Sequence, residues 1–220
     1  MSLEPLSRES SASIIADQIR NGIMEGLFEP GQQMGEAQLA NQLGVSRGLL
    51  REAMQRLVQE GLLRSERYRG LFVVELGEDD ICDVYLAREG VEQAAVRALM
   101  RRPEADLAPL DKVVNQMSSA VRRRRAGALP QLDLEFHAVL VEASGSTRLR
   151  RVMQSLLVET GMCQKQLQSS YEDPAVRVLE HEQILSALHE RDLERALKLV
   201  SVHMTDAVER LVGRRPAASA

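Results

Sequence analysis

LANQLGVSRGLLREAMQRLVQEGLLRSERYRGLFV, residues 39–73, is the stretch that decides the fold of the N-terminal part of this chain. Its apolar residues recur at helical spacing and predict a short helix over residues 35–43 and a longer helix over residues 46–59. Gly44 stands between the two helices, where a left-handed backbone conformation allows a sharp turn. Ser46 follows in the position from which a hydroxyl caps the second helix. The stretch therefore predicts two helices joined by a tight turn.

A pair of short strands is predicted after the second helix. Gly61 ends that helix, and residues 62–65 and 71–76 are expected to form two strands joined by an arginine-rich tip at residues 66–70. A hairpin beside a helix is a wing, which can reach phosphates or the adjacent minor groove. Two helices joined in this way fit the major groove of DNA. We therefore predict a winged helix-turn-helix domain over residues 1–76.

The charge of the chain is concentrated where this domain would meet DNA. The whole chain has a formal net charge of −4, and residues 1–76 hold 8 basic and 10 acidic residues. Residues 46–70 nevertheless hold six arginines against three glutamates. Arg47 and Arg51 lie four apart, which places them on one face of the helix. Because so small a basic footprint gives few phosphate contacts per chain, the sequence predicts a homodimer.

The same region contains an ordered set of residues that forms a specific pattern. Its members are Gly31, Glu36, Leu39, Ala40, Val45-Ser46-Arg47, Arg51-Glu52-Ala53, Leu57, Glu60-Gly61-Leu62, Arg69-Gly70 and Val73. This pattern resembles the DNA-binding domain of bacterial GntR-type transcription regulators, and double-stranded DNA with a palindromic operator is the partner that the resemblance implies. It also implies DNA contacts by Ser46, Arg47 and Arg51 in the helix and by Arg67, Tyr68 and Gly70 in the wing tip. The chain departs from the family at Gly48-Leu49, where Thr-Pro is usual, and at Ala37, where some members carry an arginine.

The remainder of the chain is predicted to be an all-α domain over residues 77–220. Helical periodicity runs from residue 80 to residue 212 and is interrupted by Pro, Gly and Asp at five places, which delimits about six helices. Aromatic residues are only 3% of the chain and Trp is absent, so its cores are built mainly from Leu, Val, Ala and Met. The predicted fold class is mainly α, a winged helix-turn-helix followed by a helical bundle.

Composition also indicates where the protein resides. No apolar run approaches eighteen residues and the N-terminus has no signal-peptide pattern, so we expect no membrane partner and a cytoplasmic protein. Cys82 and Cys163 match no metal or redox spacing and are expected to be buried thiols in a reducing compartment.

Candidate metal ligands lie on three of the predicted helices. Asp133 and His137 are four apart, which puts a carboxylate and an imidazole on one otherwise apolar face. His181 and His203 are each in step with apolar residues of their own helices, whereas His189 stands in a polar turn and is expected to be exposed. Ligands from several helices of a bundle can converge in its core. The alternative for any single histidine is a hydrogen-bonded, partly buried residue without a metal.

The spacing around these residues provides a second resemblance. Asp133-x-x-x-His137, the segment from Glu180-His181 through Ala196, and His203 are similar to the effector-binding FCD domain of the FadR-like branch of GntR regulators. In metal-binding members of that branch the matching residues hold a divalent cation, usually Zn²⁺, Ni²⁺ or Mn²⁺. The imidazole and carboxylate donors rank Zn²⁺ first and Ni²⁺ close behind.

The resemblance also implies a ligand for that metal. Arg88 and Glu92 match the family's Arg-x-x-x-Glu, in which the arginine helps to bind a small organic-acid effector. A guanidinium suits a carboxylate, and four protein ligands on an octahedral ion leave two positions for a chelating acid. The alternative is a surface Arg88–Glu92 ion pair. Gln164 and its two successors stand where many members carry arginine or aromatic pocket residues.

Two functions from different classes are compatible with this sequence. The favoured one is a DNA-binding transcriptional regulator, a repressor rather than an enzyme, controlled by a carboxylate at the metal. The alternative is a metal-dependent hydrolase with a DNA-binding appendage. A hydrolase needs a general base near the open metal position, and we identify no additional inward-facing carboxylate in the sequence.

Overall fold

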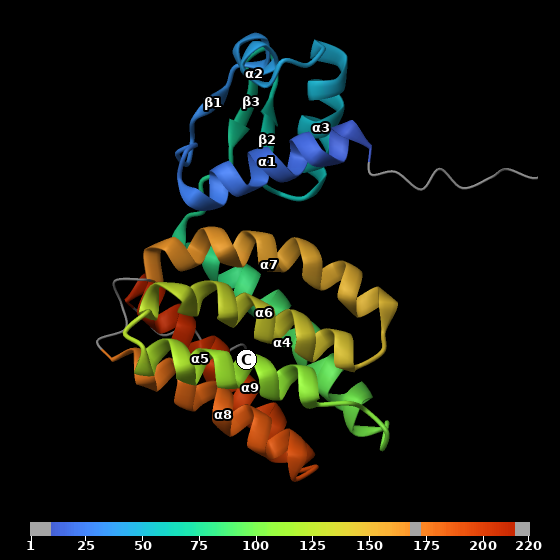
Figure 1. The fold of residues 1–220 in the computed structure, drawn as a ribbon, viewed down its shortest axis with the longest axis vertical. Coiled ribbons are helices and arrows are strands. Elements are labelled where there is room, and N and C mark those ends of the chain that lie inside the picture. Colours follow the sequence, from blue (N-terminus) through green and yellow to red (C-terminus); the bar gives the residue numbers. More distant parts are fainter. Residues whose placement is uncertain (1–9, 168–172, 214–220) are drawn as a thin grey trace, which may run out of the picture. The chain divides into compact units, whose positions relative to one another are not determined.

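The computed structural model describes residues 10–167 and 173–213. Its contacts divide the chain into two compact units, with the boundary between Glu75 and Leu76. We describe each unit separately (Figure 1).

The N-terminal unit contains three helices and a small antiparallel sheet with the strand order β1-β3-β2 (Figure 1). Its helices are α1 (Ser11–Glu25), α2 (Glu36–Leu43) and α3 (Arg47–Gln59). Its strands are β1 (Gln33–Met34), β2 (Leu63–Glu66) and β3 (Gly70–Val73). Helices α1 and α2 both pack on α3, whose apolar face is completely buried. This arrangement confirms the winged helix-turn-helix.

The turn between α2 and α3 forms as the sequence predicts. Gly44 has a φ of 64°, and its backbone N–H donates to carbonyls of the last turn of α2. The Ser46 hydroxyl accepts a hydrogen bond from the backbone N–H of Leu49 and so caps α3. Gly61, just beyond α3, also has a positive φ, at 79°.

Both predicted strands form, but a third strand, β1, was not predicted. Gln33 and Met34 pair with Phe72 and Leu71 and add β1 to the outer edge of β3. This strand is two residues long and is held by a partner nearly forty residues away, so no local alternation of polar and apolar residues marks it. The added strand closes one edge of the wing hairpin.

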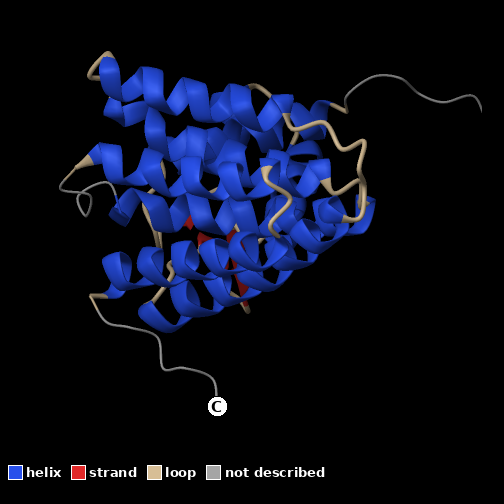
Figure 2. Ribbon diagram, turned by 90° about the horizontal axis from the view of Figure 1, so that it is seen from below, coloured by secondary structure: helices blue, strands red, loops and turns tan. Residues whose placement is uncertain are grey.

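The C-terminal unit is a bundle of helices, as expected, and the strands of the described chain, red in Figure 2, all come from residues 33–73 of the other unit. Its six α-helices are α4 (Glu78–Met100), α5 (Ala108–Arg122), α6 (Leu129–Ala143), α7 (Thr147–Leu167), α8 (Pro174–His189) and α9 (Leu193–Val212). A single 3-10 turn, η1 (Ala126–Ala128), precedes α6. Helix α4 packs against α6, α7 and α9, which makes it the inner helix of the bundle. The described helices include none with the length and apolarity needed to cross a membrane.

Candidate metal centre and DNA-contact surface

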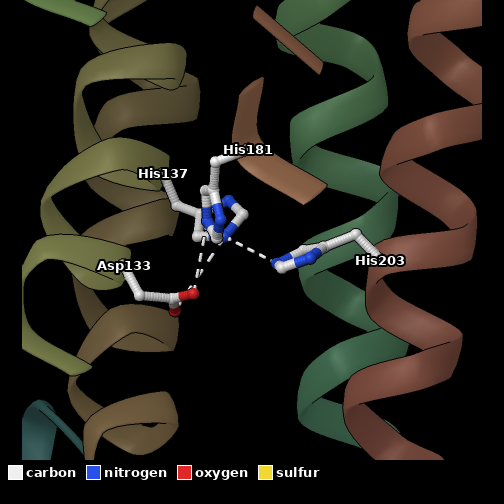
Figure 3. A group of neighbouring side chains, drawn as sticks. All are labelled: Asp133, His137, His181 and His203. Atoms are coloured by element: carbon white, nitrogen blue, oxygen red, sulfur yellow. Dashed lines mark hydrogen bonds and ion pairs between the residues drawn. The ribbon is translucent and has the colours of Figure 1, made fainter. Parts of the chain in front are cut away.

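The four predicted metal ligands meet in the core of the helical bundle. Asp133 and His137 project from α6, His181 from α8 and His203 from α9, and their side chains point toward one another (Figure 3). All four residues are buried, and one potential ligand atom from each lies within 4.8 Å of the others. His189 instead lies exposed at the end of α8, 2.8 Å from an oxygen of Asp111. The bundle therefore gathers the four residues that the sequence singled out and leaves His189 exposed, as expected.

The separations within this cluster match those of ligands around one ion. His137 Nε2 lies 3.0 Å from His203 Nε2, and His181 Nε2 lies 3.3 Å from Asp133 Oδ1. Two ligands at Zn–N distances of about 2.0–2.1 Å, at tetrahedral or octahedral angles, are separated by roughly 2.9–3.4 Å. His137 Nε2 and Asp133 Oδ2 are 4.0 Å apart, and all four ligand atoms lie within 4.8 Å of one another, so binding one ion requires the side chains to move closer together.

Every histidine of the cluster is oriented through its other ring nitrogen. His137 Nδ1 faces Glu92 Oε2 at 2.7 Å, His203 Nδ1 faces Glu180 Oε2 at 2.9 Å, and His181 Nδ1 faces the carbonyl oxygen of Arg177 at 2.7 Å. Carbonyl and carboxylate oxygens accept hydrogen bonds, so each Nδ1 is the nitrogen that carries the proton. The three Nε2 atoms are then left with lone pairs, which is the arrangement found around bound metal ions.

The three Nε2 atoms at the centre of the cluster consequently face other acceptors. Three Nε2 lone pairs and the Asp133 carboxylate converge, and two of these contacts, His137 to His203 and His181 to Asp133, bring acceptor against acceptor. Such contacts are unfavourable unless a cation lies between the atoms. The donor set of three imidazoles and one carboxylate therefore fits a divalent transition metal.

Electrostatics keep this centre in the form that binds metal. Burial lowers the pKa of His137 to about 4, with Glu92 opposing and Arg88 reinforcing the shift, so the ring is neutral at neutral pH. Burial also disfavours the charge on Asp133, but its surroundings, which include the charge of Arg177, hold its pKa well below the usual range. His137 and Asp133 therefore need not lose protons when a cation binds at neutral pH.

Arg88 and Glu92 form a buried pair, so the surface ion pair considered from the sequence was wrong. Arg88 donates from Nε and Nη2 to Glu92 Oε1, at 3.2 and 3.0 Å, and both side chains are almost fully excluded from solvent. Glu92 also accepts a hydrogen bond from His137, so Arg88 is connected to this candidate metal ligand through Glu92. On the opposite side, Arg210 donates to Glu180, which faces His203.

The contacts that several polar residues make with the candidate ligands were missed by sequence reasoning. The expectation that no further carboxylate faces inward was wrong, because Glu92 and Glu180 both contact ligand histidines. Gln164 of α7 donates from Nε2 to Asp133 Oδ2 and is buried. Arg177 is also buried in spite of its charge. The available signal was a set of polar residues at inward-facing helical positions, but their partners depend on how the helices pack.

The predicted DNA-contacting residues lie on the exposed side of the N-terminal unit. Ser46, Arg47 and Arg51 are all exposed on the first turns of α3. Arg51 donates from Nε and Nη2 to Glu36 Oε2, at 3.3 and 2.8 Å, so its guanidinium already has a partner on α2. This pair connects the first residue of α2 to the second turn of α3.

The wing tip presents the remaining candidates. Tyr68 has a φ of 64°, and 91% of it is exposed. The guanidinium of Arg67 lies over its ring, 4.9 Å from the centroid. Gly70 has a φ of 98°, a conformation that glycine adopts at no steric cost. The tip therefore presents the Arg67 guanidinium stacked on the exposed ring of Tyr68. Tyr68 and Gly70 both have a left-handed backbone conformation.

Comparisons with known proteins agree with this architecture. Residues 12–73 match the family described as bacterial regulatory proteins, gntR family, and residues 83–206 match the FCD domain. The gluconate operon transcriptional repressor of Bacillus licheniformis is 30% identical over 207 residues, which are 90% of this chain and 83% of that protein. The HTH-type transcriptional regulator YdhC of Bacillus subtilis is 28% identical over 198 residues, which are 89% of this chain and 88% of that protein.

Solved structures show the same fold at lower identity. A GntR transcriptional regulator from Rhodococcus sp. RHA1 superimposes with a TM-score of 0.79 at 24% identity, covering 94% of this chain and 100% of that chain. E. coli McbR/YncC gives 0.77 at 22% identity, covering 94% and 99%. Taken with the two family matches, the winged helix-turn-helix and the helical bundle identify the chain as a member of the GntR family of transcription regulators with a C-terminal FCD domain, a family of regulators and not of enzymes.

Proposed function

We propose that this regulator is a homodimeric repressor that binds a palindromic operator and responds to a small organic acid. In this proposal Ser46, Arg47 and Arg51 meet the major groove, while Arg67, Tyr68 and Gly70 at the wing tip meet phosphates or the minor groove. Repression is supported by the names of relatives, which include the gluconate operon repressors of two Bacillus species. Dimerisation is supported by the small, local excess of basic residues over residues 46–70 of each chain.

The helical unit, residues 77–220, is the proposed sensor and dimerisation domain. Asp133, His137, His181 and His203 would hold a divalent ion, for which their donors rank Zn²⁺ first, then Ni²⁺, with Mn²⁺ third. When bound, such an ion supplies a Lewis-acidic anchor for a carboxylate. The observation that carries the proposal is the convergence of three Nε2 lone pairs on one buried carboxylate.

The balance of buried charge supports an anionic effector. Apart from histidines, the charged side chains that are buried within the described ranges are Arg88 and Arg177 on one side and Glu92 and Asp133 on the other. These four charges cancel, so a divalent ion leaves an excess of two positive charges inside the bundle. Uncompensated charge in a protein interior is costly. A carboxylate effector, with Arg88 nearby to bind it, offsets that excess.

The proposal is tested on the purified full chain. Genomic fragments that the protein selects should share a palindrome, and two chains should bind each site. Metal-loaded protein should bind small carboxylic acids, and one of them should change operator affinity, with a reciprocal change in acid affinity on DNA. His203→Ala should lower the metal content and abolish the response to acid while operator binding persists. Binding of one chain to an asymmetric site, or an acid response that survives without metal, would contradict the proposal.

A further inference from the structure

Gln164 lies in the core of the helical bundle, and one half of its amide is bound to a proposed metal ligand. Only 3% of the residue is exposed, and its Nε2 donates to Asp133 Oδ2. The orientation of the amide follows from chemistry, since a carboxylate can only accept and would repel the amide oxygen. Gln164 is therefore held against a metal ligand through its nitrogen.

The other half of this amide is a buried acceptor. Oε1 of Gln164 is inaccessible to solvent and receives no hydrogen bond from any residue in the described ranges. The oxygen belongs to the same planar amide as Nε2, so it lies next to the Asp133 contact, at the edge of the metal centre. A buried acceptor left unpaired is costly, and a site that contains one favours ligands that can donate to it.

The nature of the donor is restricted by the charges around it. A hydroxyl and an ammonium group could both donate to Oε1. An ammonium would add positive charge beside Arg88 and Arg177, both of which act electrostatically on Asp133, and beside the divalent ion. A hydroxyl donates equally well and adds no charge.

We propose that Gln164 selects effectors that carry a hydroxyl next to the carboxylate, so that the effector class is the 2-hydroxycarboxylates. This rests on the proposed function, because it assumes an acid at the metal centre. The carboxylate offsets the charge of the metal and the buried arginines, while the hydroxyl on the adjacent carbon donates to Gln164 Oε1. Acids without that hydroxyl leave the buried oxygen unpaired, and 2-amino acids meet electrostatic repulsion.

Matched sets of acids test the selection. Binding to zinc-loaded protein is measured by calorimetry with glycolate, acetate and glycine, with lactate, propionate and alanine, and with malate, succinate and aspartate. Among the acids whose carbon skeleton fits the site, the hydroxy acid should bind at least about tenfold more tightly than the acid without a hydroxyl. A tenfold difference corresponds to the loss of one buried hydrogen bond. The amino acid should bind more weakly still. Equal binding of hydroxy and unsubstituted acids, as expected if only water meets Oε1, overturns the selection but leaves a carboxylate effector standing.

Variants place the preference on Gln164 itself. Gln164→Met has similar volume but offers no amide oxygen, and it should bring the affinities of the hydroxy and unsubstituted acids together. Gln154→Met, at an exposed position of the same helix, is the matched control and should retain the preference. Zinc content is measured on each protein, so loss of metal is separated from loss of selectivity. A preference that survives in metal-loaded Gln164→Met overturns the assignment, and absence of binding by all acids to the unaltered protein overturns the carboxylate effector as well.

Discussion

Glu180 and His203 come from neighbouring helices, and Glu180 Oε2 accepts a hydrogen bond from His203 Nδ1 at 2.9 Å. Arg210, about two helix turns beyond His203 on α9, donates to the same carboxylate. Glu92 and Arg88 repeat the arrangement on His137. Two of the three imidazoles are thus held by an arginine–glutamate pair that fixes the proton on Nδ1. Such carboxylates orient ligand histidines and increase their basicity.

Changing Glu180 to Gln should therefore weaken metal binding without removing a ligand. The amide can no longer offer a charged acceptor to His203, and we expect the affinity for Zn²⁺ to fall by about tenfold to a hundredfold. Competition with a chromophoric chelator measures this affinity. Glu182→Gln is the matched control, because Glu182 lies on the same helix but accepts from Ser118 on α5 instead. Equal affinities in the two variants would show that Glu180 has no such role.

Acid should destabilise the metal-free helical unit. The pKa of His137 is lowered by burial to about 4, whereas an unfolded histidine titrates near 6.5. Between these values the unfolded chain binds a proton that the folded chain does not, so stability rises with pH. The contribution, about 3 kcal/mol, is complete above pH 6.5 and is lost as the pH falls towards 4.

Urea unfolding of chelator-treated protein, followed by its helical signal, measures this dependence. The Asp133 carboxyl, whose pKa is also lowered, extends the loss to still lower pH. His137→Gln removes the titrating ring and should flatten the curve between pH 6.5 and 4. A free energy of unfolding that is constant over this range in the unaltered protein would be inconsistent with a buried, neutral His137.

The parts of the fold that were predicted correctly are those specified by neighbouring residues. Gly44 and Ser46 define the turn and the cap of α3 within three positions of sequence, and both behave as expected. The strand β1 was missed because pairing with β3 through the backbone creates it, and the two residues Gln33 and Met34 carry no pattern of their own. Local rules could not have located it.

The candidate site divides in the same way. The spacing of Asp133 and His137 alone places them on one helical face. The resemblance to the FCD domain grouped them with His181 and His203, which lie on other helices. The roles of Glu180 and Gln164 depend on which helices face each other, since Glu180 reaches across to α9 and Gln164 reaches across to α6. Periodicity assigns a residue to the inside of the bundle but does not name the side chain that it meets there.

Removal of the Arg51 side chain should weaken operator binding specifically. Arg51→Ala deletes one cation from the exposed face of α3, and we expect a loss of about 1–3 kcal/mol in binding, the range for one arginine contact. Arg56→Ala is the control, because Arg56 is exposed on the same helix and lies 3.6 Å from Glu60. Fluorescence anisotropy with labelled operator measures both affinities at one fixed salt concentration. If the two variants bind alike, the face of α3 assigned to DNA is incorrect.

Glu36 should increase the preference of this surface for operator DNA over random DNA. Its carboxylate accepts both hydrogen bonds from Arg51, yet the pair is largely exposed, so its effect on folding stability is small. On DNA the carboxylate acts differently, because a negative charge beside Arg51 repels phosphates at every sequence. Base contacts at the operator can compensate for that repulsion, whereas random DNA offers only the backbone. Glu36→Gln should therefore raise the affinity for random DNA more than the affinity for the operator.

The ratio of operator affinity to random-DNA affinity distinguishes this effect of Glu36 from a general effect of net charge. Glu29→Gln removes one negative charge from an exposed turn of the same unit and is the matched control. It should change both affinities by similar factors and leave their ratio intact, while Glu36→Gln lowers the ratio by a few-fold, as expected for one exposed charge near a phosphate. The lowered ratio should disappear in the Arg51→Ala background if Glu36 acts by orienting that guanidinium, and should persist if Glu36 repels phosphates directly. Identical ratios for Glu36→Gln and Glu29→Gln would mean that the Glu36–Arg51 pair has no part in reading DNA.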